Sequence, residues 1–174
     1  MNLIRLTLVL LSGLLAAGTL HAQPASSPDA VINRLAESLM TTALQAVGES
    51  GSVYPFALQW HAGEDEVELL GYRGEADQAP PSDQWALALQ QRLQQQAATD
   101  PTLMAAGLVR MSEVKTEQGE TLPGLWALVD HRDGRPVVLF LPFLANPQGG
   151  KRVPGEVIYH APQQGLFDAQ RQAR

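Results

Sequence analysis

The chain of 174 residues contains no cysteine. It therefore has no disulfide, no thiol nucleophile, no thiolate ligand for a metal and no cysteine to which a lipid could be attached. Without disulfides, the fold depends on its core even in an oxidising compartment. The G-x-S-x-G pattern of serine hydrolases and the P-loop pattern are also missing, so the sequence offers no signature of nucleophilic catalysis or phosphate binding.

The sequence also lacks an apolar run of about 20 residues, the length that a membrane-spanning helix needs. Its most apolar stretch, Leu6–Leu15, is shorter, follows Arg5, and leads to small residues that end at Ala22. This arrangement is typical of a cleavable secretory signal peptide over residues 1–22. An uncleaved anchor is the competing interpretation. We expect cleavage, and therefore a periplasmic or secreted protein with no stable membrane anchor.

Positive charge is scarce. The chain has 12 Lys and Arg against 18 Asp and Glu, for a formal net charge of −6, and its lysines are Lys115 and Lys151. Such an acidic balance argues against nucleic acid as a partner. Removal of residues 1–22 leaves 152 residues, which suits one domain. We expect a flexible leader over 23–27, a single domain over 28–167, and a polar, partly disordered tail over 168–174.

Two segments have the spacing of amphipathic helices. The first begins at Ser27-Pro28-Asp29, with Ser27 as cap, and has a natural stop at Gly48. The second begins at Ser82, which we expect to cap it, and ends at Asp100-Pro101. Its glutamines indicate a solvated helix face rather than an interaction tract. They are Gln90, Gln91, Gln94 and Gln95.

The remaining segments have the alternation of strands. Two of them, 52–61 and 67–73, form a predicted hairpin, and three more form a predicted meander. The meander strands are 105–114, 122–131 and 136–143, and 156–160 forms a last short strand. Pro136 to Phe143 is apolar at nearly every position, which predicts a strand covered on both faces. The fold class is therefore α+β, a single antiparallel sheet of five to six strands with two helices packed against it. The helix-hairpin-helix-meander order resembles that of profilin-like and roadblock-like domains.

Several short motifs resemble a group of small bacterial proteins of unknown function. They are Asp130-His131-Arg132-Asp133-Gly134 at a strand end, Pro142-Phe143 at the next strand end, Gly155-Glu156, Leu166-Phe167 and Tyr54-Pro55-Phe56-Ala57. In that group the first motif is Glu-His-Arg-x-Gly and the second is Pro-Tyr. Here Asp130 stands in place of the Glu and Phe143 in place of the Tyr. The resemblance implies no activity.

Three histidines outside the signal peptide are the main candidates for chemistry. His61, His131 and His160 each fall near a strand end, but they lack the close spacing of a metal site. The acidic stretch around Glu64 lacks the spacing of a calcium loop. We therefore predict no bound metal and no cofactor.

The densest group of charges is the expected hairpin tip after residue 129. Asp130, His131, Arg132 and Asp133, with Trp126 upstream on the same strand, are the candidate binding residues. Asp130 and His131 should point to opposite faces of the strand. The simpler interpretation is a solvated turn whose polar residues serve the turn geometry, because Asp-Gly favours a tight hairpin.

These observations favour an exported, non-catalytic binding or protein-interaction module. Its partner would be a protein or a small molecule of the cell envelope. The alternative is an envelope hydrolase that uses His131 or His61 with nearby carboxylates, with or without a metal.

The signal peptide generates the first prediction. The mature protein should begin at Gln23, within a few residues, and should fractionate with soluble periplasmic or secreted material. N-terminal sequencing of the protein from fractionated cells measures this. Recovery of Met1 in the membrane pellet would contradict it.

Overall fold

The computed structural model describes residues 27–64 and 66–172; the expected signal peptide and nearly all of the leader lie outside these residues. The elements, in chain order, are α1 (Pro28–Ser50), β1 (Phe56–His61), β2 (Glu68–Leu70), the 3-10 turn η1 (Ala76–Gln78), α2 (Ser82–Thr99), β3 (Leu103–Lys115), β4 (Thr121–His131), β5 (Val137–Leu144), β6 (Val153–Pro154), β7 (Ile158–His160) and α3 (Asp168–Gln172).

The strands form one antiparallel sheet in the order β2-β1-β3-β4-β5-β6, with β7 also paired to β5. The expected α+β class with a single antiparallel sheet is confirmed. The sheet has seven strands, rather than five to six, because the segment after β5 returns to it twice. The central strands β3 and β4 pair over eleven positions.

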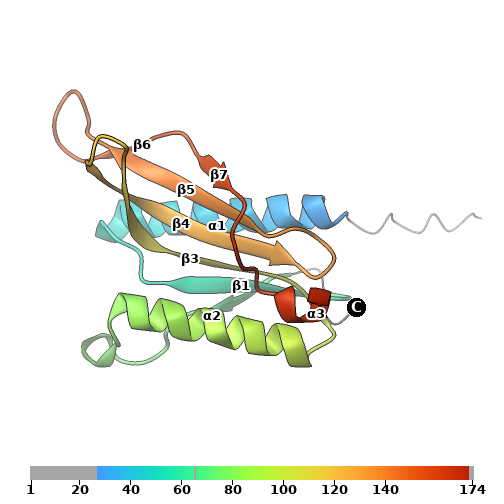
Figure 1. Cartoon of the computed structure of the whole chain (residues 1–174). Helices are drawn as coiled ribbons and strands as arrows, with labels where there is room; N and C mark the ends of the chain where they lie inside the picture. The colour runs from blue at the N-terminus through green and yellow to red at the C-terminus, as the bar shows by residue number, and fades with distance from the viewer. Residues whose placement is uncertain (1–26, 65, 173–174) are drawn as a thin grey trace, which may run out of the picture.

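The two long helices cover opposite faces of this sheet (Figure 1). Alternation along β3 explains how one strand serves both layers. Ala105 and Val109 point into the cluster beneath α1, whereas Ala106 and Leu108 point into the cluster beneath α2. Strand β5 is likewise buried from Val138 to Leu141, so the prediction of a strand covered on both faces is confirmed.

The ends of the helices correct two expectations. The Ser27 hydroxyl accepts a hydrogen bond from the backbone N–H of Ala30, as expected of a cap, but α1 continues through Gly48. It ends at Gly51, which adopts φ 80° and donates its backbone N–H to the Val47 carbonyl. Only glycine takes that left-handed conformation at little cost. Ser82 is the first residue of α2 rather than its cap, because Pro81 occupies the cap position.

The strand ends also differ from expectation. Strand β1 begins at Phe56 rather than residue 52, directly after Pro55, which has no N–H to donate to a ladder. The tail from Asp168, expected to be partly disordered, forms helix α3 as far as Gln172. Leu166 and Phe167, just before α3, are fully buried in the cluster beneath α2. Figure 1 shows this C-terminal segment crossing from β7 toward α2.

Candidate binding groove

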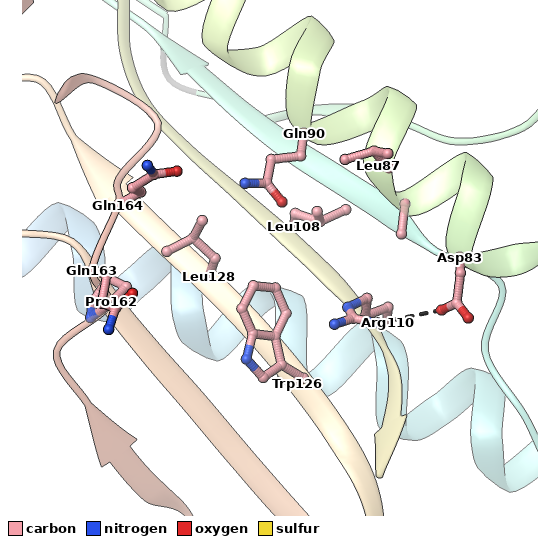
Figure 2. A pocket seen from close by; sticks show the side chains of 11 residues that line it. Asp83, Leu87, Gln90, Leu108, Arg110, Trp126, Leu128, Pro162, Gln163 and Gln164 are labelled. Atoms are coloured by element: carbon pink, nitrogen blue, oxygen red, sulfur yellow. Dashed lines mark hydrogen bonds and ion pairs between the residues drawn. The ribbon is translucent and has the colours of Figure 1, made fainter. Parts of the chain in front are cut away.

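Helix α2 covers β1 and β3 but leaves part of β4 open on its own face of the sheet. The segment between β7 and α3 crosses back over this face. A groove of about 400 Å³ lies between that segment and α2 (Figure 2). Clefts of this size are typical of ligand sites.

The floor of the groove is apolar and comes from paired positions of β3 and β4. Leu108 lies opposite Leu128, and Arg110 lies opposite Trp126, so all four side chains project on the same face. Both leucines are at most 2% exposed, whereas Trp126 is half-buried. The guanidinium of Arg110 lies 5.1 Å from the centre of the Trp126 ring, within the range of a cation–π contact.

An ion pair closes one end of the groove. Arg110 Nη1 lies 3.3 Å from the Oδ1 atom of Asp83, which stands in the first turn of α2 (Figure 2). A carboxylate is favourable there because of the positive end of the helix dipole. The Asp83 side chain is 89% exposed, so the pair itself contributes little to stability. The Arg110 guanidinium thus contacts both the Asp83 carboxylate and the Trp126 ring.

Amide side chains face each other across the groove. Gln90 comes from α2, and Gln163 and Gln164 come from the crossing segment (Figure 2). Within the described part of the chain, none of these three amides has a hydrogen-bond partner. Gln91 and Gln95 are exposed as the sequence predicted, but Gln90 and Gln94 are half-buried, and Gln90 lines the groove. Helical periodicity could not single out Gln90, because the opposite wall comes from a segment far along the chain, at Gln163 and Gln164.

The three indole N–H groups also differ in whether they have a hydrogen-bond acceptor. Trp60 donates its indole N–H to the Glu64 carbonyl at 2.8 Å, and Trp85 donates to the Pro55 carbonyl at 2.9 Å. The indole N–H of Trp126 has no acceptor among the described residues. The groove therefore holds one indole donor and three amides that are available to a ligand.

Of the five candidate residues from the sequence, only Trp126 lines the groove. The others lie at the far end of β4, and the expected solvated tip is wrong for Asp130 and His131, which are 0% and 4% exposed. As predicted, these two neighbours belong to opposite faces. The Cβ atom of His131 lies beside Gly134, which also adjoins Pro28 and Ile32 of α1, while the carboxylate of Asp130 faces the C-terminal segment.

The Asp130 carboxylate anchors the C-terminal segment. Its Oδ2 atom accepts hydrogen bonds from the backbone N–H groups of Leu166 (2.7 Å) and Phe167 (3.1 Å), and its Oδ1 atom accepts one from the His131 backbone (2.8 Å). Arg171 donates from both terminal nitrogens, one to each oxygen, at 2.9 Å. Five donors thus compensate the buried charge. A side chain at Gly165 would collide with this cluster.

Arg132 and Asp133 complete the turn. The Arg132 guanidinium donates to the Leu103, Ala97 and Asp100 carbonyls, two of which belong to the carboxyl end of α2 and its cap. Cations are favourable at that end of a helix. Asp133 is exposed, and its backbone N–H donates to the Nδ1 atom of His131. This motif therefore ties α2 and the C-terminus to the sheet.

Arg171 is the functional partner that sequence reasoning missed. An arginine in a polar tail carries no local signal of a buried contact. The adjacent apolar pair, Leu166 and Phe167, was the one available indication that the segment packs on the core. Asp130 raises the pKa of Arg171, and the Arg171 hydrogen bond lowers the pKa of Asp168.

The histidines lie apart from the groove. His61 Nδ1 is 3.5 Å from the Asp100 carboxylate and 3.2 Å from the Thr102 hydroxyl, and hydrogen bonds from Thr102 lower the pKa of Asp100. His160 is exposed on β7. Over residues 27–64 and 66–172, no group of three or more His, Asp or Glu could hold a metal ion.

Comparison of the chain with protein-family models, curated proteins and solved structures finds no significant match. None of the helices between residues 27 and 172 has both the length and the apolar character that a bilayer crossing requires.

The Asp130 anchor generates a stability prediction. Asp130→Asn keeps the shape of the side chain but leaves Arg171 facing an amide donor or a neutral oxygen. We expect a loss of about 2–4 kcal/mol in the free energy of unfolding, below the range for a fully buried pair because Arg171 is 26% exposed. Urea denaturation measures this. Asp83→Asn is the matched control, and equal stability of the two variants would contradict the anchor.

The buried His131 predicts a pH dependence. Burial lowers the pKa of His131 below its ordinary 6.5, although the Asp133 and Asp130 carboxylates oppose the shift. The unfolded chain therefore takes up a proton near pH 6.5 that the native state resists. The contribution to stability is complete above that pH and is lost as the pH falls below it.

His131→Asn should flatten this dependence, because the Asn oxygen can accept the Asp133 N–H bond without titrating. Melting temperatures at pH 7.5 and 5.5 measure the effect. His160→Asn, on the exposed strand β7, is the control and should behave as the wild type. A pH dependence that is unchanged in His131→Asn would refute the assignment.

Proposed function

We propose that the protein is an exported, non-catalytic binding module and that the groove between α2 and the crossing segment is its binding site. The signal-like N-terminus supports export. The element order supports a profilin-like or roadblock-like arrangement, with α1 and α2 on opposite faces of the sheet. Such folds host unrelated functions, so the proposal rests on the groove and not on the fold.

The observation that supports this function best is the set of unused hydrogen-bonding groups above an apolar floor. Gln90, Gln163 and Gln164 present amides from both walls, and Trp126 presents an indole donor between them. A glutamine amide both donates and accepts, so it complements a peptide group in either orientation. The ionic groups of the groove, Asp83 and Arg110, already neutralise each other. We infer that the ligand is a short, uncharged, extended peptide segment of an envelope protein.

The alternative of an envelope hydrolase has less support. His131 is buried and accepts a backbone hydrogen bond, so its ring is closed to a substrate. The His61–Asp100 pair is accessible, but neither residue lines the groove. Bound zinc at a stoichiometry near one in the purified protein, lost on mutation of His61 and His131, would favour the hydrolase.

The three indoles provide the test of the binding function. We would titrate 15N-labelled protein with a library of uncharged tetrapeptides, blocked at both ends, and follow the indole N–H resonances. Binding in the groove should shift the Trp126 resonance and leave those of Trp60 and Trp85 in place, because their N–H groups are bonded to backbone carbonyls.

Adjacent glutamines supply the matched control. Gln90→Glu loses the amide donor that faces the groove, whereas Gln91→Glu makes the same change on an exposed position. Loss of one hydrogen bond, about 1 kcal/mol, should weaken binding by about fivefold in the first variant only. The proposal fails if no peptide shifts Trp126, or if both variants lose affinity equally.

A further inference from the structure

A second cavity, of about 420 Å³, lies at the opposite end of the sheet from Asp130, on the face that α1 covers. It opens where the carboxyl end of α1 meets the loop between β5 and β6, a region that Figure 1 shows well away from α3. It shares no lining residue with the groove.

The walls of this cavity are almost entirely apolar. Leu44 and Val47 of α1 form one side, and Met111 and Phe143 of the sheet form the other. All four also belong to, or pack against, the main cluster beneath α1. The cavity therefore extends the core into an opening rather than forming a separate surface depression. Its volume corresponds to on the order of ten to fifteen water-sized groups at ~30 Å³ each.

Two cations stand at this cavity, although the chain as a whole is acidic. Lys151 makes no hydrogen bond or ion pair with any described residue. Arg152 donates Nη1 to the Phe143 carbonyl at 3.0 Å, which fixes its guanidinium beside the apolar wall. Positive groups beside an apolar cavity complement a ligand with an anionic head and a hydrocarbon body.

These cations are not needed to cap α1. The carbonyl of Val47 accepts the Gly51 N–H, and the carbonyl of Ala46 accepts the Ser50 hydroxyl. Glu49, the acid in the last turn, accepts a hydrogen bond from Gln45. The carboxyl end of the helix thus has its own partners, and the free Lys151 remains available.

We propose that this cavity binds a single-chain amphiphile with an anionic head, such as a fatty acid or the acyl chain of an acidic lipid. The hydrocarbon chain lies between α1 and the sheet, and the head meets Lys151 and Arg152. This site is independent of the peptide groove and of the function proposed for it.

Calorimetric titration of the purified chain with dodecanoate tests the proposal, with dodecyltrimethylammonium as the cationic counterpart. We expect dodecanoate to bind more tightly than the cation. Lys151→Glu should weaken dodecanoate binding by about fivefold or more, since an attraction becomes a repulsion. Lys115→Glu changes the net charge equally at the only other lysine and should leave binding within twofold.

A blocking variant separates binding from folding. Gly48 lines the cavity and a Cβ atom there would meet nothing within 4 Å, so Gly48→Phe is chosen to obstruct the opening. Glycine in a helix is the least favourable ordinary residue apart from proline, so the change should not cost helix stability. The melting temperature of this variant should be unchanged or higher, with dodecanoate binding abolished. Absence of binding to the wild type, undiminished binding to Gly48→Phe, or equal losses in the two lysine variants would each overturn the proposal.

Vesicles distinguish the two sources of the ligand. Co-sedimentation with phosphatidylglycerol vesicles, but not with phosphatidylcholine vesicles, would assign the acyl chain to a membrane lipid, provided that Lys151→Glu abolishes it. Dodecanoate binding without co-sedimentation would assign it to a free amphiphile. Co-sedimentation that Lys151→Glu leaves unchanged would contradict a role of this site at membranes.

Discussion

The contact between Asp130 and the C-terminal segment fixes where that segment crosses the face of the sheet that α2 leaves partly open. A carboxylate at the end of a central strand is shielded completely from water and is compensated by five donors. Two of those donors are the consecutive backbone N–H groups of Leu166 and Phe167. Because a buried charge without its partners is costly, this carboxylate specifies where the segment returns to the sheet.

That return creates one wall of the groove. Gln163 and Gln164 directly precede Gly165, whose lack of a side chain allows the segment to approach Asp130 and Arg171 closely. Arg132, two residues beyond Asp130, holds the carboxyl end of α2. The amino-terminal half of the same helix forms the other wall of the groove. The motif at the end of β4 thus contacts both elements that form the walls, although none of its side chains lines the groove.

The layered arrangement explains why the groove beside α2 and the cavity beside α1 differ in character. Helix α1 buries a continuous apolar stripe, so the opening at its carboxyl end is lined by core residues such as Leu44 and Phe143. Helix α2 presents glutamines beside its buried stripe, and the opening next to it is lined by amides. The chemistry of each cavity follows from the bordering helix together with the loop or segment on its other side.

The sequence by itself determined the two helices, the meander and the α+β class, because hydrophobic periodicity is a local property that tertiary contacts rarely reverse. It also placed Asp130 and His131 on opposite faces, since a strand alternates. Local pattern placed boundaries less well. Gly48 and Gly51 are both plausible stops, and only the left-handed turn with its bond to Val47 selects the second.

The tertiary structure alone decided that Asp130 and His131 are buried and that the groove exists. A charged Asp-Gly turn looks the same in sequence whether it is solvated or buried, and the difference here is made by Arg171, some 40 residues away. Gln90 lines the groove because Gln163 and Gln164 form the wall on its other side. These contacts join segments far apart in the chain, and no period or local motif within either segment encodes its partner.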